Sequence, residues 1–147
     1  MLRAVSIFPA GTWAPDRARE RIVLLSDERF RRRARLATES GFEFLLDLPQ
    51  ATTLKGGDAL ALEDGGLVLV EAAAEPLVEV TAEDAATLAR LAFHIGNRHV
   101  PAEIGDGRIR IRDDRVIVAM LRRLGARARR LKAPFNPEIG AYAHGHE

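Results

Sequence analysis

The sequence contains no cysteine and only three serines, Ser6, Ser26 and Ser40. The absence of cysteine excludes disulfides, thiolate nucleophiles, zinc ribbons and iron–sulfur sites. None of the serines lies in a Gly-x-Ser-x-Gly motif, which excludes the usual nucleophile elbow. The glycines form neither a Walker loop nor a dinucleotide-binding fingerprint, because "KGGD" and "EDGG" are typical of hairpin turns. The familiar covalent-catalytic and nucleotide-binding motifs are therefore missing.

The sequence also lacks a long apolar run, and none approaches the ~18 residues that a membrane span needs. The amino-terminal stretch "MLRAVSIFPAGTW" lacks the apolar core and cleavage site of a secretory signal. A formal net charge of +1 argues against a dedicated nucleic-acid-binding protein. At 47% hydrophobic residues, the 147-residue chain can bury a core. We therefore expect a cytoplasmic protein of one or two domains that binds neither membrane nor nucleic acid.

Short apolar or alternating runs, separated by glycines, fill the first half of the chain. This pattern predicts β-strands over residues 21–25, 42–48, 58–62 and 66–72. The basic segment 27–37 fits either a helix or a strand, and we favour a strand. Strands at this regular spacing predict a small β-barrel or sandwich.

The pattern changes at "EAAAEP", residues 71–76, which we interpret as a hinge before a strand over residues 77–80. Thr81 to Asp84 then resembles a capping box at the start of a helix. Apolar residues recur behind it at helical spacing: Ala85, Leu88, Ala92 and Ile95. The helix should end near residues 94–96, because Gly96 and Asn97 both tolerate the left-handed conformation of a helix terminus.

The next segment, "RIRIR" at residues 108–112, alternates arginine with isoleucine and predicts a half-buried strand after the Asp106-Gly107 turn. Residues 113–125 fit either a hairpin strand or a helix. We favour a helix capped by Asp113 or Asp114 and ended by Gly125. Its expected apolar stripe is Val116, Met120 and Leu124. The alternating segment 126–133 predicts a final strand.

Together these elements predict an α+β protein with three parts. Residues 1–74 form a small N-terminal all-β domain. Residues 75–134 read β-α-β-β-α-β, the order of a ferredoxin-like domain. From Pro134 on, prolines, glycines and small residues dominate, so residues 135–147 are expected to form a flexible, histidine-containing tail.

The four histidines are the candidate ligands for a metal ion, since imidazole is the commonest metal-donating side chain. His99 lies just beyond the expected helix end, and its structural alternative is a surface or helix-capping histidine. His144 and His146 can chelate an ion without prior folding, or they belong to an inert terminus. His94 is a weaker candidate because its place in the last helical turn also suits a half-buried structural residue.

One chain offers one loop imidazole and a flexible pair, which is too little for the three-ligand arrangement of a catalytic zinc site in a rigid pocket. Two chains related by a two-fold axis would bring two copies of His99 together and add both tails. Such a nitrogen-rich, water-open site suits Ni²⁺, Cu²⁺ or Zn²⁺. It favours holding and releasing an ion over catalysis, so we do not expect an enzyme.

The segment "LAFHIGNRHVP" resembles the signature of the UreE family of urease accessory proteins, which are nickel metallochaperones. The resemblance continues in the same order through "RRRARLATESGFEFLLDLP", "LKGGDALALEDGGLVLVEAAAE", "VIVAMLRRLG" and "APFNPEIGAYAHGH". It covers nearly the whole chain, and "GNRH" followed by "PF-x-PE-x-GAY" is its most specific part. The chain departs from the family at Phe93, where tyrosine is usual.

The resemblance implies an N-terminal domain similar to a chaperone's peptide-binding domain and a ferredoxin-like metal-binding domain. It implies a homodimer whose central Ni²⁺ is held by His99 of each chain, with His144 and His146 as further ligands and Zn²⁺ or Cu²⁺ as competitors. The nickel would pass to apo-urease through the urease accessory GTPase and its scaffold proteins. With only two tail histidines, we expect about one ion per dimer rather than nickel storage.

Two other functions fit parts of the sequence. An RNA-binding ferredoxin-like module would use the basic segments "RFRRRAR" and "RARRLK", but "RIRIR" offers no aromatic residue for base stacking. A metallohydrolase would need a general base such as Glu103 or Glu138, and no spacing selects either residue. The basic segment 29–35 is either a solvated face or a docking surface for an acidic partner.

Overall fold

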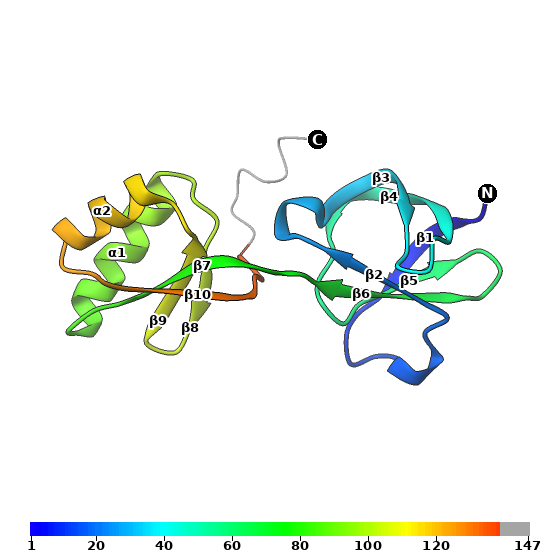
Figure 1. Ribbon diagram of the computed structural model, residues 1–147, viewed down its shortest axis with the longest axis horizontal. Coiled ribbons are helices and arrows are strands. Elements are labelled where there is room, and N and C mark those ends of the chain that lie inside the picture. Colours follow the sequence, from blue (N-terminus) through cyan, green and yellow to red (C-terminus); the bar gives the residue numbers. More distant parts are fainter. Residues whose placement is uncertain (139–147) are drawn as a thin grey trace. The chain divides into compact units, whose positions relative to one another are not determined.

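The computed structural model describes residues 1–138 and divides the chain into two compact units, with the boundary between Ala73 and Ala74. The N-terminal unit, Met1–Ala73, consists of strands and two short 3₁₀ helices, whereas the C-terminal unit combines a sheet with two α-helices (Figure 1). The predicted α+β class is confirmed. None of the helices found within residues 1–138 is long and apolar enough to cross a membrane.

The N-terminal unit is built on one curled six-stranded sheet (Figure 1). Its strands lie in the order β2-β6-β5-β1-β4-β3, with parallel pairs β1–β4 and β2–β6 and otherwise antiparallel pairs. The core consists mainly of aliphatic residues from β2, β4, β5 and β6. The elements are β1 (Arg3–Phe8), η1 (Pro15–Arg17), β2 (Glu20–Leu24), η2 (Ser26–Glu28), β3 (Phe30–Ala37), β4 (Glu43–Thr53), β5 (Ala59–Leu62) and β6 (Leu67–Ala72).

The two edge strands of this sheet, β2 and β3, are linked at one end. The Thr38 hydroxyl, just after β3, donates a 2.6 Å hydrogen bond to the Glu20 carboxylate at the start of β2. The Glu39 backbone N–H donates to the Arg21 carbonyl at 3.2 Å. Hydrogen bonds from Ser40 and then Thr38 lower the pKa of Glu20. The sheet therefore curls until its edges meet at this turn, as in an incompletely closed barrel.

Sequence patterns predicted most of these strands, including the ambiguous segment 27–37, which contains β3. They missed β1, although it lies in the middle of the sheet between β5 and β4. Ala4 is its only fully buried residue, and a bulge between Ala4 and Ser6 breaks the alternation that marks a strand. Strand β4 continues past its predicted end at residue 48 because Pro49 lies at a register shift, where no ladder hydrogen bond is lost.

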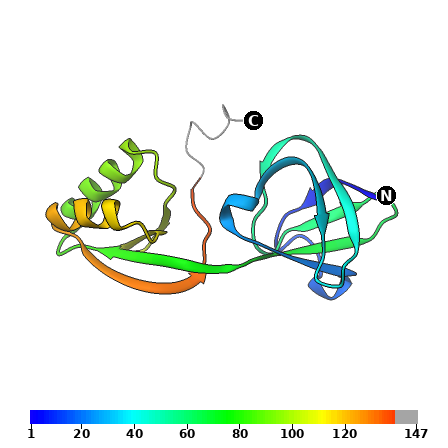
Figure 2. The same ribbon diagram turned by 45° about the horizontal axis from the view of Figure 1, so that its top comes forward.

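The C-terminal unit is a four-stranded antiparallel sheet in the order β10-β7-β9-β8, with both helices on one face (Figure 2). Its element order, β-α-β-β-α-β, confirms the predicted ferredoxin-like domain. Buried residues of β7, β9, α1 and α2 form one continuous core. The elements are β7 (Ala74–Thr81), α1 (Ala85–Asn97), β8 (Glu103–Gly105), β9 (Arg108–Arg112), α2 (Arg115–Arg123) and β10 (Arg127–Pro134).

The segment 71–76, interpreted as a hinge, is strand on both sides of Ala73. Pro76 lies within β7, next to Lys132 of β10, and pairing with β9 starts only at Leu77. A proline is tolerated there because its missing N–H is not needed by a second neighbouring strand. Since β7 continues to Thr81, the predicted capping box is wrong, and Asp84 caps α1 by accepting from the Thr87 N–H at 2.8 Å.

Helix α2 begins at the cap formed by Asp114, whose side chain accepts from the backbone N–H groups of Val116 and Ile117. Its predicted apolar stripe is wrong by one residue. The buried face consists of Ile117, Val118 and Leu121, whereas the Val116 side chain is 73% exposed. Three consecutive apolar residues allow either face of the helix to be buried, and packing against the core cluster selects the one observed.

Candidate metal centre

His99 occupies the position at which the chain reverses after α1. The helix ends at Asn97, Arg98 is its C-cap, and His99 has a φ of 58°. It is the only residue other than glycine within residues 1–138 that has a positive φ. The His99 N–H donates to the Gly96 carbonyl at 3.0 Å, and the Val100 N–H donates to the Ile95 carbonyl at 3.2 Å. These two bonds form a Schellman motif, whose left-handed residue is usually glycine.

The expectation that Gly96 and Asn97 end the helix is therefore wrong, because both are helical residues. The reason is the apolar core. Ile95 is buried, and Val100 packs against the same core cluster. For Val100 to return to this core, the chain must reverse between Arg98 and Val100, which leaves the left-handed conformation to His99.

This conformation costs an L-residue other than glycine about 1–2 kcal/mol. The backbone of His99 is held by the two capping hydrogen bonds, while the residue as a whole is exposed. Residues held in unfavourable backbone conformations cluster at functional sites. His99 thus joins an accessible imidazole to a fixed backbone, which is the arrangement that a metal ligand needs.

His94 lies one turn earlier, in the last turn of α1, and is half-buried. Its ring meets that of Phe93 edge to face, with 5.4 Å between the ring centroids. The Phe93 side chain is 67% exposed, an unusual position for a large aromatic residue. The end of α1 therefore presents two imidazoles and one exposed phenyl ring.

His144 and His146, the other predicted ligands, lie outside the described residues. The chain that leads to them is held as far as it is described. Phe135 is fully buried, so packing continues beyond the predicted start of the tail at residue 135. The Asn136 N–H donates to the Glu103 carboxylate at 2.8 Å, and the Glu138 N–H donates to the Ala102 carbonyl at 2.7 Å. The C-terminal segment is thus anchored beside the beginning of β8, close in sequence to His99.

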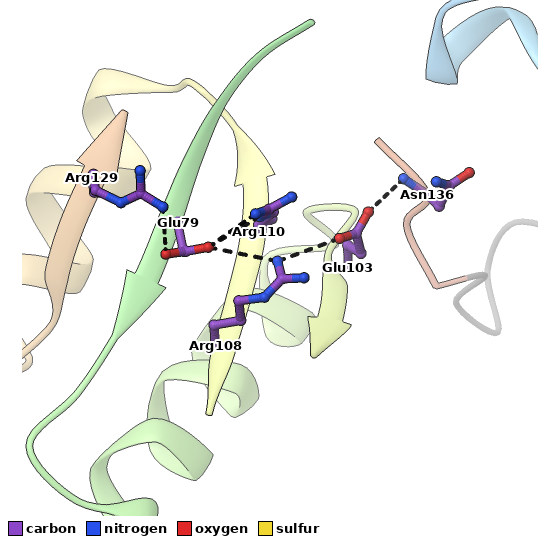
Figure 3. Close-up of polar contacts among 6 residues, drawn as sticks. All are labelled: Glu79, Glu103, Arg108, Arg110, Arg129 and Asn136. Atoms are coloured by element: carbon purple, nitrogen blue, oxygen red, sulfur yellow. Dashed lines mark hydrogen bonds and ion pairs between the residues drawn. The ribbon is translucent and has the colours of Figure 1, made fainter. Parts of the chain in front are cut away.

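A network of charges supports this anchor on the open face of the sheet (Figure 3). The central Glu79 carboxylate accepts from Arg129 at 2.9 Å and from Arg110 at 3.2 Å, the residues opposite it on β10 and β9. Arg108 lies between two carboxylates, 3.7 Å from Glu79 and 3.6 Å from Glu103. The guanidinium of Arg129, followed by that of Arg110, lowers the pKa of Glu79. The network holds Glu103 where it receives the Asn136 N–H.

No group of three potential metal ligands comes together within residues 1–138. Glu103, a candidate general base, is already engaged by the Asn136 N–H and by Arg108. His99 is therefore the most exposed histidine among the described residues, and neither it nor Glu103 belongs to a group of three potential ligands there.

These observations define a two-domain α+β protein whose ferredoxin-like unit presents an exposed histidine on a fixed helix end. The family model described as the UreE urease accessory protein, N-terminal domain, matches residues 4–73, and its C-terminal-domain counterpart matches residues 75–147. The chain belongs to the UreE family of urease accessory proteins.

Individual relatives match over nearly the full chain. The urease accessory protein UreE of Beijerinckia indica is 50% identical over 143 residues, covering 97% of this chain and 82% of the relative. That of Rhodobacter capsulatus is 50% identical over 145 residues, covering 99% of this chain and 89% of the relative. That of Chelativorans sp. is 50% identical over 148 residues, covering 100% and 91%.

Replacing His99 by glycine should stabilise the C-terminal unit, because glycine adopts a positive φ without the penalty of a side chain. His99→Ala is the matched control, since alanine also removes the imidazole but keeps the penalty. We expect the glycine variant to exceed the alanine variant by about 1 kcal/mol in free energy of unfolding. Urea denaturation followed by circular dichroism measures this difference. Equal stability of the two variants would contradict the left-handed assignment.

Glu79→Gln should reduce stability at neutral pH but much less in acid. The pKa of Glu79 is lower in the folded protein than the ordinary glutamate value of 4.5. Its stabilisation is therefore complete above that value and disappears as the pH falls through the lower, folded pKa. The difference in unfolding free energy between wild type and variant should thus shrink between pH 7 and pH 3. A difference that stays constant over this range would show that the charge of Glu79 does not contribute to the unfolding free energy.

Proposed function

We propose that this protein is a nickel-binding metallochaperone that carries Ni²⁺ to apo-urease during urease maturation. It acts as a homodimer and holds the ion between the two copies of His99. The observation that carries this proposal is the exposed imidazole of His99 on a left-handed backbone that two hydrogen bonds fix. Membership of the UreE family supplies the link to urease.

A second copy of the chain accounts for two features of the C-terminal unit. His99 has too few companions within residues 1–138 to hold an ion, and a two-fold axis doubles every donor near it. Phe93 exposes its ring on the helix that ends next to His99. Burial of such a ring in an interface contributes roughly 1.5–3 kcal/mol per copy. The exposed ring of Phe93 and the incomplete donor set around His99 therefore both favour pairing of two chains through this end of α1.

The C-terminal histidines complete the proposed site. The Glu138 N–H is hydrogen-bonded to the Ala102 carbonyl, and His144 lies six positions further along the chain. An extended chain of that length reaches about 20 Å, whereas Ala102 lies three positions after His99, a reach of about 10 Å. His144 and His146 can therefore come to His99 without release of the anchor at Glu138.

A site of this kind is suited to delivery rather than catalysis. Imidazole nitrogen binds Ni²⁺, Zn²⁺ and Cu²⁺, so the two latter ions compete for it. Ligands from a chain terminus can leave one by one, which gives the ion a route out of the site. We propose that release occurs in the cytoplasm, to the urease accessory GTPase and the scaffold proteins that act with it.

The RNA-binding alternative finds less support in the C-terminal sheet. The open face that would receive RNA carries arginines on β9, of which Arg108 and Arg110 are paired with carboxylates. Its charge is therefore partly neutralised by Glu79 and Glu103, and no aromatic residue of β9 is present for stacking. The metal-carrier function is the one that we retain.

Loss of the His99 imidazole should abolish tight nickel binding. We expect His99→Gly to weaken Ni²⁺ affinity by roughly 100-fold or more in isothermal titration calorimetry, since each dimer loses two donors. The double variant His144→Ala/His146→Ala should weaken binding less. His94→Gln is the matched control and should retain the affinity of the wild type. Unchanged stoichiometry and affinity in the glycine variant would place the site elsewhere.

Removal of the exposed phenyl ring should weaken the dimer. We expect Phe93→Ser to shift the protein towards monomer in sedimentation-velocity experiments, with dimer dissociation raised roughly 100-fold for two buried rings. Val116→Ser is the control, because Val116 is similarly exposed but lies on α2. A monomeric wild type, or dissociation caused only by the Val116 variant, would contradict the proposed interface.

A further inference from the structure

The segment from Asp113 to Lys132, which forms α2 and β10, is much more basic than the rest of the chain. It contains seven arginines and lysines but only two acidic residues, in a protein with a formal net charge of +1. The remainder of the chain is therefore net acidic. Such an asymmetry indicates a surface that interacts through charge.

Part of this charge converges on a cavity of about 220 Å³ between α2 and β10. Arg115 and Arg122 reach it from α2, and Arg130 reaches it from β10. Aliphatic side chains also line the cavity: Val78, Val118 and Ala128. The cavity therefore combines three guanidinium groups with an apolar lining. Asp113 is the one acidic residue among the described residues that line it.

The pairing of these arginines differs from that on the opposite face of the sheet. There, the arginines around Glu79 share two carboxylates. In the cavity, Arg130 pairs with Asp113 at 3.3 Å. Neither Arg115 nor Arg122 forms an ion pair with any acidic residue of the described chain. The fold thus neutralises one set of arginines and leaves two cavity arginines available to a ligand.

We propose that this cavity docks an acidic segment of a partner protein, with one carboxylate side chain seated among Arg115, Arg122 and Arg130. The planar guanidinium group binds a carboxylate through two parallel hydrogen bonds, and several such groups around one cavity select for it. The aliphatic lining suits the methylene groups of a glutamate or aspartate. The neighbouring Arg123, Arg127 and Lys132 extend the attraction to further acidic residues of the segment.

An acidic protein segment fits this face better than RNA does. Among residues 1–138, no aromatic side chain lines the cavity, so these residues offer bases nothing on which to stack. Asp113 lies inside the cavity and Asp114 is adjacent in sequence, and both repel a continuous phosphate backbone. A single carboxylate side chain can avoid Asp113 and Asp114 because it occupies only one position among the arginines. The inference depends on the charge and shape of this face and not on the proposed nickel site.

The test uses the intact protein and a fluorescein-labelled peptide of alternating aspartate and glutamate, measured by fluorescence anisotropy at physiological salt. The double variant Arg115→Gln/Arg122→Gln should lose roughly tenfold in affinity, because it removes the two cavity arginines that form no ion pair within residues 1–138. The matched control is Arg123→Gln/Arg127→Gln, which removes the same charge from α2 and β10 outside the cavity. It should lose less than about threefold.

Three results would overturn the proposal. The first is no binding of the acidic peptide to the wild type, or equal binding of a control peptide in which asparagine and glutamine replace the acids. The second is an equal loss of peptide affinity in the two double variants, which would indicate diffuse electrostatic attraction without a defined binding position. The third is tighter binding of a uridine oligonucleotide than of the peptide. Circular dichroism melting curves confirm that the variants fold, as expected for exposed arginines. Nickel affinity, measured in parallel, separates this outcome from failure of the metal site.

Discussion

The return of the chain to the core after α1 is the constraint on which the candidate site depends. Ile95 and Val100 pack into the same apolar cluster, and the hydrogen bond between their backbones closes a tight reversal. The reversal forces His99 into the left-handed conformation and turns it away from the core. Hydrophobic packing thus fixes the position of a polar side chain that takes no part in that packing. The backbone position of this candidate ligand is therefore set by the fold itself.

The rest of the C-terminal unit holds another segment of the chain against residues that are close in sequence to this reversal. Strands β10 and β8 are the two edges of the ferredoxin-like sheet, and the segment that follows β10 reaches the beginning of β8. Hydrogen bonds at Glu103 and Ala102 hold the segment that follows β10 there. The charges around Glu79 are directly opposite one another on neighbouring strands, so they stabilise the sheet and the anchor together.

The sequence was sufficient to predict the architecture where periodicity was strong. The alternation in "RIRIR" predicted β9 correctly, with Ile109 and Ile111 buried and the arginines on the opposite face. Prediction failed where tertiary packing decided between local alternatives. Strand β1 has too little alternation to be recognised, and the run Val116–Val118 fits two helix registers.

The candidate site shows the same contrast between what local sequence predicts and what tertiary packing decides. Residue type and position after a helix were sufficient to name His99 as a candidate ligand from the sequence. Its left-handed backbone was not predictable, because Gly96 and Asn97 are better suited to that conformation than histidine. Only the requirement that Val100 rejoin the core reveals which residue must adopt it. The anchoring of residues 135–138 was also missed, since their composition is typical of an unstructured tail.

The most direct test of a histidine pair held by this reversal is a crystal structure of the nickel-loaded protein, with anomalous scattering recorded at the nickel absorption edge. We predict a nickel peak on the two-fold axis of a dimer, bound by one ring nitrogen of His99 from each copy, with a positive φ at both residues. A peak bound within a single copy, or far from His99, would contradict this arrangement.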